Sequence, residues 1–497
     1  MQEDYIKSVY AGVLGKVIGV YMGRPFEGWR KKRIEEKWGL VDHYVNEDMN
    51  QPLVVPDDDI TGTLTFIRAL EDSGLYADTT AEFFGEAWLN YIIENKTILW
   101  WGGLGVSTEH TAYLRLKEGI KAPSSGSMEL NGQAVSEQIG AQIFIDGFGL
   151  VCPGKPELAA TLAERAARVA HDGEAVYAAK VVAAMISAAF AEKHMDRLLD
   201  IGVSMIPADA MIARVHRDIR EWSKEDSNWR ETFNRIEAKY GYDKFSGYCH
   251  VIPNHAIMVM AWCWAPNNFR RSQAIINTAG WDTDCNAANV GCLMGVKLGL
   301  ERINEDYDFQ SPFADRIYLP TSEGTRGVSD VLREAMHLSR IGCKIMDWDI
   351  PSSPKDGALF HFSQPGALHG FMPEKMPGDA AECICRNVTS SVNTKERCLE
   401  IEISNLSSGI CRVSTPLLAE TGSSGTYEIM GTSIISPGMK VSIEGRITES
   451  SAPLSIKTFI RPDGENTEMI YSNVVSPGTE GSFVLEIVAP DMDRPIK

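Results

Sequence analysis

The chain has 497 residues, which is enough for a large hydrophobic core and for two domains. Hydrophobic residues make up 44% and charged residues 23%, as in ordinary soluble globular proteins. The formal net charge of −19 argues against a general surface for nucleic acids or anionic membranes. It does not exclude a phosphate-bearing substrate, because bound metal ions reverse the local sign of an acidic pocket.

The first five residues, MQEDY, are acidic where a secretory leader is basic, and no apolar stretch is long enough to span a bilayer. The ten cysteines are scattered, and the close pair Cys383 and Cys385 has no second pair with which to form a zinc site. We therefore expect free thiols in a cytoplasmic protein with no membrane or nucleic-acid partner.

Residues 1–345 are predicted to be helical. Apolar residues recur at helical spacing through the alanine-rich segment 156–192, and further helices are expected over 60–70 and 286–300. Glycine-rich joints interrupt the helices, notably WWGGLG at 100–105. Such a joint either brings the backbone close to a ligand or makes a tight turn between packed helices.

The pattern changes near PSSPKDG at 351–357. Beyond it, short runs of alternating polarity at 398–403, 440–445 and 482–488 are separated by Pro, Gly, Ser and Asn. This spacing predicts an antiparallel β-sandwich, like a jelly roll, over residues 356–497. This part shows no acid pair or metal pattern, so we expect an accessory role or a role in homo-oligomer formation.

Two acidic clusters lie more than two hundred residues apart, and each precedes a predicted helix. The first contains Asp57, Asp58 and Asp59, and the second contains Asp282 and Asp284 within the run GWDTDC. For either cluster alone, helix capping is a sufficient explanation. Three consecutive aspartates exceed what one cap needs, and oxygen-rich clusters suit Mg²⁺ or Mn²⁺. Together, the two clusters predict a centre for two divalent cations.

Three motifs in order resemble the ADP-ribosylglycohydrolase family, the group that includes the dinitrogenase-reductase-activating glycohydrolase and the ADP-ribosyl-acceptor hydrolases. The first is the glycine-rich run GVLGKVIGVYMGRPFE at 12–27, which ends in Glu27. The second and third are the two acidic clusters. The resemblance covers about the first 345 residues.

This resemblance implies an all-α orthogonal helix bundle with two Mg²⁺ or Mn²⁺ ions in a central cleft. It also implies cleavage of the glycosidic bond at ribose C1 of an ADP-ribosylated protein. The metal ligands implied are Asp58, Asp59, Asp282 and Asp284, and Asp57 replaces a threonine of the family pattern with a charged oxygen. The implied catalytic residues are Glu27, Asp58 and Asp284.

Other departures bear on the substrate. Ile60 and Cys285 stand where the family usually has Thr or Ser, and Cys285 is a poor ligand for a hard cation. These departures keep the metal ligands but change their neighbours. A small riboside or nucleoside therefore stays an alternative substrate. A non-catalytic binding or structural protein on the same fold is a second alternative.

Candidate substrate-binding residues complete the hypothesis. Aromatic side chains offer flat faces to a sugar or base, although core packing is their commoner role. The other candidate residues follow the glycine-rich joint or lie where the family has segments that face the substrate. The set is Trp101, Gly102, Gly103, Glu109, Asn131 and Trp281.

Overall fold

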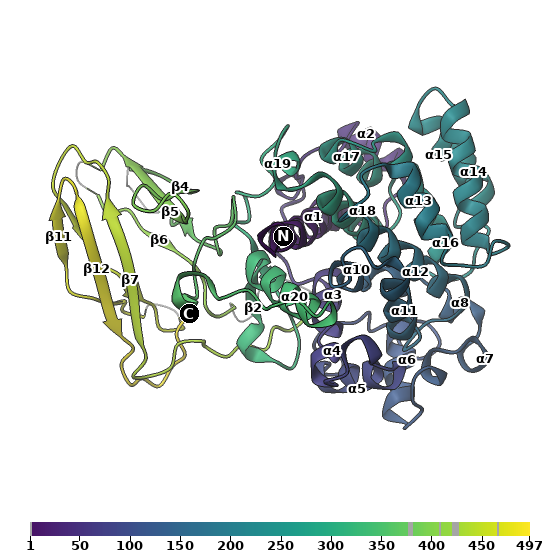
Figure 1. The fold of residues 1–497 in the computed structure, drawn as a ribbon, viewed down its shortest axis with the longest axis horizontal. Helices are drawn as coiled ribbons and strands as arrows, with labels where there is room; N and C mark the ends of the chain where they lie inside the picture. Colours follow the sequence, from purple (N-terminus) through teal and green to yellow (C-terminus); the bar gives the residue numbers. More distant parts are fainter. Residues whose placement is uncertain (1, 376–380, 407–408, 420–426, 465–466) are drawn as a thin grey trace.

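The computed structural model describes residues 2–375, 381–406, 409–419, 427–464 and 467–497. A helical region and a region of short strands lie side by side along the long axis of the molecule (Figure 1). The helices are α1 Gln2–Gly23, α2 Lys31–Trp38, α3 Asp58–Phe66, α4 Ala69–Asp72, α5 Ala81–Tyr91, α6 Thr108–Lys117, α7 Met128–Asn131, α8 Gln133–Ser136, α9 Gly140–Ile143, α10 Asp146–Leu150, α11 Pro156–Ala167, α12 Gly173–Ala188, α13 Met195–Val203, α14 Met211–Glu225, α15 Trp229–Tyr240, α16 Val251–Trp264, α17 Phe269–Ala279, α18 Thr283–Leu298, α19 Leu300–Ile303 and α20 Val331–Ile345.

Helices α1 and α18 lie next to each other in the helical region (Figure 1) and are buried along almost their whole length. They pack backbone against backbone. A Cβ atom built on Gly15 would lie 2.1 Å from the carbonyl oxygen of Gly291, and one built on Gly19 would lie 2.2 Å from that of Ala287. Only glycine permits so close an approach. The contact continues to Gly23, whose Cβ would lie 2.5 Å from the amide nitrogen of Asp284.

The predicted helices are present, with shifted ends. The helix expected over 60–70 begins at Asp58 and is divided into α3 and α4, and the alanine-rich segment forms α11 and α12. The helix expected over 286–300 begins at Thr283 and ends before Gly299, which has a φ of 84°. Among the described residues, no helix is both long and apolar enough to cross a bilayer.

The strand region begins after α20. Its strands are β3 Met372–Pro373, β4 Glu382–Thr389, β5 Arg397–Ser404, β6 Val413–Ser414, β7 Lys440–Ile447, β8 Leu454–Ile456, β9 Phe459–Ile460, β10 Ile470–Tyr471, β11 Val475–Gly478 and β12 Gly481–Val488. Two other strands, β1 Arg316–Tyr318 and β2 Val328–Asp330, pair with each other within the helical region. The ladders are antiparallel, as expected, and the three predicted strand runs lie in β5, β7 and β12. Their assembly into a sandwich stays a prediction.

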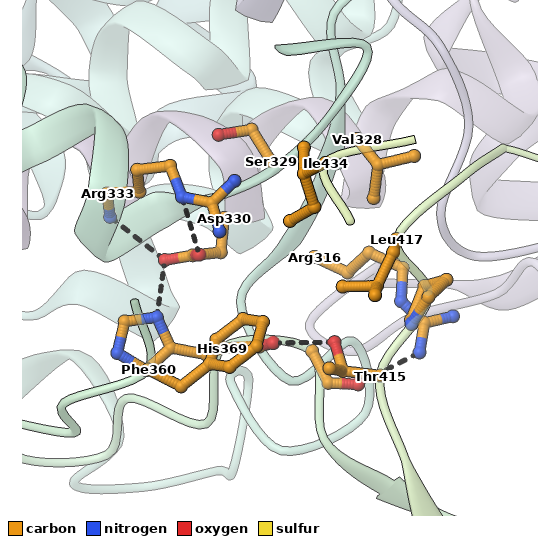
Figure 2. A pocket seen from close by; sticks show the side chains of 12 residues that line it. Arg316, Val328, Ser329, Asp330, Arg333, Phe360, His369, Thr415, Leu417 and Ile434 are labelled. Atoms are coloured by element: carbon orange, nitrogen blue, oxygen red, sulfur yellow. Dashed lines mark hydrogen bonds and ion pairs between the residues drawn. The ribbon is translucent and has the colours of Figure 1, made fainter. Parts of the chain in front are cut away.

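A polar joint connects the helical region to the segment that leads into the strands. Figure 2 shows the small pocket there, in which Asp330 caps α20 and its Oδ1 lies 3.0 Å from Nδ1 of His369. Burial opposes the ionisation of Asp330, but His369 and Arg333 outweigh it and lower its pKa. Thr415 donates a hydrogen bond to the carbonyl of His369 at 2.8 Å. The residues that line this pocket do not include any of the acidic clusters.

The close packing of α1 on α18 makes a testable prediction. Gly19→Ala should lower the free energy of unfolding by about 1–3 kcal/mol, because the added methyl meets rigid backbone atoms of α18. Gly12→Ala is the matched control, since its methyl would meet the side-chain ends of Leu150 and Val296, which can move. Both substitutions gain the same helix propensity. Urea unfolding of the two variants should separate them, and equal losses would contradict the role of the close contact.

Candidate metal centre

The early acidic cluster begins helix α3. Asp57 has extended backbone angles and its Oδ1 accepts a hydrogen bond from the amide of Asp59 at 3.0 Å, so it is the N-cap. The capping explanation therefore holds for one aspartate of the three. Asp59 is buried and Asp58 is half-buried. Their carboxylates lie in the first turn of the helix, beyond what capping requires.

The late acidic cluster begins helix α18. Trp281, in a left-handed backbone conformation with a φ of 67°, exchanges backbone hydrogen bonds of 2.7 Å with Gly28 and Trp29. The hydroxyl of Thr283 donates to the carbonyl of Gly23 at 2.8 Å. These bonds fix the segment that carries Glu27 beside Asp282 and Asp284.

The fold brings the two clusters together. Ligand atoms of Glu27, Asp282 and Asp284 lie within 4.8 Å of one another, and so do those of Asp59, Asp284 and Cys285. Those of Asp57, Asp58 and Asp59 form a third group with the same spacing. Asp284 belongs to two of these groups and Asp59 to two. The five aspartates predicted as metal ligands therefore surround one place in the fold, with Glu27 at its exposed side.

The residues present fit divalent cations. Within the described part of the chain, Oδ1 of Asp59 and Oδ1 of Asp282 are buried and have no hydrogen-bond partner. Burial and the negative charges of Asp58 and Asp284 raise the pKa of Asp57 to about 8. Burial and neighbouring carboxylates also raise the pKa of Asp59 and Asp282 well above the usual range. Carboxylates crowded in this way are stabilised in their charged form by Mg²⁺ or Mn²⁺.

Cys285 does not belong to this oxygen set. Its thiol donates a hydrogen bond to Oδ2 of Asp59 at 3.2 Å. Burial, followed by the charges of Asp282 and Asp59, raises the pKa of Cys285 well above its usual value. A thiol that stays protonated is a poor ligand for a hard cation. Cys285 therefore acts as a hydrogen-bond donor that orients Asp59.

Arg24 lies at the acidic centre, and the sequence interpretation did not assign it a role. Its Nε lies 3.3 Å from Oδ2 of Asp57, and its Nη1 lies 3.9 Å from Oδ2 of Asp284 and forms an ion pair with Glu27. Burial alone would lower the pKa of Arg24. The negative charges of Asp284 and Asp57 have the larger effect together and raise its pKa above the usual value. The positively charged guanidinium of Arg24 thus lies at the edge of the acidic centre. The only signal in the sequence is the position of Arg24 three residues before Glu27.

A second positively charged side chain, that of Lys16, lies on the buried side of the acidic centre. Nζ of Lys16, on α1, donates to Oδ2 of Asp146 at 2.8 Å, and Asn289 of α18 donates to the other oxygen of Asp146 at the same distance. Lys16 also acts on Asp59, where its charge opposes the rise in pKa that burial causes. Lys16 belongs to the glycine-rich opening motif, but nothing in the sequence indicated this partner.

The glycine-rich joint lies against the first turn of α6. The indole of Trp101 donates to the carbonyl of Thr97 at 2.8 Å, and its ring packs edge-on against His110. The amide of Gly103 donates to Nδ1 of His110 at 3.1 Å, while Gly102 is exposed. The side chain of Trp101 is thus held by packing, which is the commoner role, and substrate binding by these residues stays a prediction.

The remaining candidates differ in their distance from the centre. Burial raises the pKa of Glu109 to about 7, and the charge of Asp58 adds to this rise. Asn131 instead donates to the carbonyl of Ser125 at 2.7 Å and contacts Arg115. The ring of Trp281 is buried against Phe233 and Tyr242.

The acidic centre also acts on a tyrosine of the strand region. Tyr427 is only 8% exposed. Burial, followed by the charges of Asp58 and Asp57, raises the pKa of Tyr427 well above its usual value, and the charge of Arg24 opposes this rise. Sequence analysis did not assign Tyr427 any role.

The family model of the ADP-ribosylglycohydrolases matches residues 1–318. The chain belongs to this family. Membership indicates hydrolysis of glycosidic bonds, and the match covers both acidic clusters and the glycine-rich opening motif.

The structure is also similar to a solved structure described as an ADP-ribosylglycohydrolase-related protein complex. The two chains share 17% identity with a TM-score of 0.47, over 69% of this chain and 99% of the other. A search of the curated proteins gives no match.

The raised pKa values predict how pH acts on this glycohydrolase without metal. Because Asp57 has a pKa of about 8 when folded and about 4 when unfolded, the folded state binds more protons between these values. Stability should therefore fall as pH rises from 5 to 8, by up to about 1.4 kcal/mol per pH unit for each extra proton. Mn²⁺ affinity should rise over the same range, because binding displaces protons.

Urea unfolding with a chelator, for wild type and Asp57→Asn, tests this pH dependence. The asparagine oxygen keeps the helix cap but does not ionise, so the variant should show a flatter pH profile and be more stable than wild type at pH 8. Asp243→Asn, at a carboxylate that is 68% exposed, is the control for the loss of one charge. Parallel profiles for wild type and Asp57→Asn would exclude the assigned cause.

Arg24 gives a separate prediction. Arg24→Gln should lower the stability of the metal-free protein at pH 8 by about 1–3 kcal/mol, because buried carboxylates lose their nearest cation. Added Mn²⁺ should then raise the melting temperature more in the variant than in wild type. Arg302→Gln, which removes an exposed pair with Glu305, is the control. An equal response to Mn²⁺ in all three proteins would show that Arg24 does not balance the cluster.

Proposed function

We propose that this protein is a metal-dependent glycohydrolase that cleaves the glycosidic bond at C1 of a ribosyl group. The observation that supports it is the convergence of Asp57–Asp59 and Asp282–Asp284 around one place, with buried carboxylate oxygens that have no partner among the described residues. Two divalent cations, Mg²⁺ or Mn²⁺, are the proposed cofactors. Asp57, Asp58, Asp59, Asp282 and Asp284 are the proposed ligands.

The proposed chemistry divides between the cations and the protein. When bound, the cations orient the ribose hydroxyls and polarise a water molecule. The surrounding carboxylates stabilise the positive charge that develops at the anomeric carbon. Asp284, next to Asp282 and Glu27, is best placed to hold both sides of the centre together.

Glu27 is the proposed proton-transfer residue. Its side chain keeps 45% of its surface exposed, so a substrate can reach it. Without bound cations, the negative charge of Asp284, followed by burial, raises the pKa of Glu27. Beside the ligand carboxylates, this carboxyl group can donate a proton to the leaving group or take one from water.

The proposed substrate is an ADP-ribosylated protein, with a small N-riboside or nucleoside as the second candidate. Ile60 and Cys285, which depart from the family pattern, support the second candidate. We place the catalytic function in residues 1–345 and an accessory or oligomerisation function in a β-sandwich of residues 356–497. A cytoplasmic location completes the proposal.

A turnover assay tests the function. Arginine- and serine-linked ADP-ribosyl peptides and a panel of nucleosides are incubated with Mg²⁺ or Mn²⁺, and released products are separated by chromatography. Asp284→Asn should reduce release by more than about a hundredfold, because it removes a charge shared by two ligand groups while its oxygen still accepts from the amide of Cys285.

The exposed substitution Asp243→Asn should leave turnover unchanged. Release of ADP-ribose from the peptides identifies the protein linkage, and release from nucleosides alone moves the substrate to small metabolites. Full activity and metal binding in Asp284→Asn would refute the assignment of the centre.

A further inference from the structure

An exposed basic face lies beside the acidic centre, on helix α2. Arg30 is the N-cap of this helix, and Arg33 and Lys37 follow it at spacings of three and four residues, which place the three side chains on one face. All three residues are exposed. Within the described part of the chain, none of the three forms an ion pair, whereas the other two lysines of α2 pair with its two glutamates. The protein thus carries surplus positive charge here, despite a net charge of −19.

Backbone contacts fix the start of the basic face next to the late acidic cluster. Arg30 forms an antiparallel bridge with Gly280, in the segment that leads into this cluster. The carbonyl of Trp29 accepts a hydrogen bond from the amide of Trp281 at 2.7 Å. Glu27 precedes Arg30 by three residues, so their Cα atoms are at most about 11 Å apart. The basic face therefore begins at the edge of the acidic centre.

Two tryptophans support the cations of the basic face. The rings of Trp29 and Trp38 are stacked, with 5.7 Å between their centroids. The guanidinium carbon of Arg33 lies 3.4 Å from the centroid of Trp29, and Nζ of Lys37 lies 4.4 Å from that of Trp38. These cation–π contacts hold both side chains in place. Because the contact with Trp29 is made through the face of the guanidinium, the N–H donors of Arg33 remain available to an anion.

A phosphate group is the ligand whose chemistry fits this face. Guanidinium groups bind phosphate through paired hydrogen bonds, and an ammonium group binds it as a point charge. In ADP-ribose, one phosphate is joined to C5 of the ribose whose C1 would be cleaved, so it lies one sugar ring away from the reacting bond. The carboxylates of the acidic centre repel an anionic phosphate, whereas the basic face attracts it.

We propose that Arg30, Arg33 and Lys37 form the subsite that binds the phosphate groups of the ribosyl substrate. This inference rests on the proposed function, because it takes the cleaved bond to lie at the acidic centre. It deepens that function, since the subsite makes the protein selective for a phosphate-bearing riboside over an uncharged nucleoside. The basic face acts on binding and leaves the chemical step to the carboxylates.

Calorimetric titration with ADP-ribose in the presence of Mg²⁺ tests the subsite on the full chain. The double variant Arg30→Gln, Arg33→Gln should bind ADP-ribose at least about tenfold more weakly than wild type, because it loses charge-assisted hydrogen bonds to phosphate. The matched control is Arg214→Gln, Arg217→Gln, which removes two exposed arginines at the same spacing on α14 and should bind as wild type does. Equal affinity in wild type and in the α2 variant overturns the proposal.

A second variant separates the charge of the two arginines from their packing. Arg30→Lys with Arg33→Lys keeps both charges, so it should bind ADP-ribose within a few-fold of wild type. Added NaCl should weaken ADP-ribose binding more in wild type than in the glutamine variant, because salt screens exposed charges. A lysine variant as weak as the glutamine variant, or equal salt dependence in wild type and the glutamine variant, would overturn the role of charge.

Mn²⁺ titration tests whether the acidic centre stays intact in the glutamine variant. Its Mn²⁺ affinity should match that of wild type, because neither arginine contacts the proposed ligands. With ADP-ribosyl peptides, the glutamine variant should show a raised KM at nearly unchanged kcat. A lowered Mn²⁺ affinity, or a lowered kcat with unchanged KM, would overturn the assignment of these residues to substrate binding.

The two proposals can fail separately. If wild type binds ADP-ribose but hydrolyses none of the substrates, the affinity comparison still decides the role of the basic face, while the proposed function loses its support. If wild type hydrolyses nucleosides but does not bind ADP-ribose, the proposed function holds with its second candidate substrate, and the phosphate subsite is refuted.

Discussion

The contact between α1 and α18 determines where the chemistry of this protein lies. Gly15, Gly19 and Gly291 let two backbones approach to a distance that no side chain permits. The contact extends to Gly23, which packs against the first turn of α18. Because the backbone is fixed there, the carboxylates of Asp282 and Asp284 have little freedom to move. A site held by backbone packing of this kind is more rigid than one built on loops.

The second constraint is the electrostatic repulsion between the clustered carboxylates. It opposes the backbone packing that brings them together. Packing brings at least five carboxylates into a buried volume, where their charged forms repel one another. Arg24 at the exposed edge and Lys16 on the buried side offset part of this repulsion. Oδ1 of Asp59 and Oδ1 of Asp282 have no hydrogen-bond partner among the described residues, which indicates that the balance is incomplete without further cations. Fold stability and metal affinity therefore depend on the same charges in opposite directions.

Sequence reasoning succeeded where the signal is local. Consecutive aspartates before a helix, helical periodicity and alternating runs such as 482–488 are patterns of neighbouring residues, and the structure contains the helices and strands that they predict. It failed where a role depends on distant partners. Arg24 looks like any arginine at a helix end, and nothing near Lys16 in the sequence points to Asp146. Cys285 was expected to be a poor ligand, and its hydrogen bond to Asp59 appears only in three dimensions.

The pairing of the first long helix with α18 also sets the order in which this chain can fold. Gly23 and Thr283, which bond across that pair, are 260 residues apart. At a synthesis rate of about 5–20 residues per second, α1 leaves the ribosome roughly 10–50 seconds before its partner. During that interval the face of α1 that packs on α18 has no partner, although Leu150 and Asp146 can already contact other parts of the helix. Successful production of this protein therefore depends on sheltering its first helix until more than half of the chain has followed.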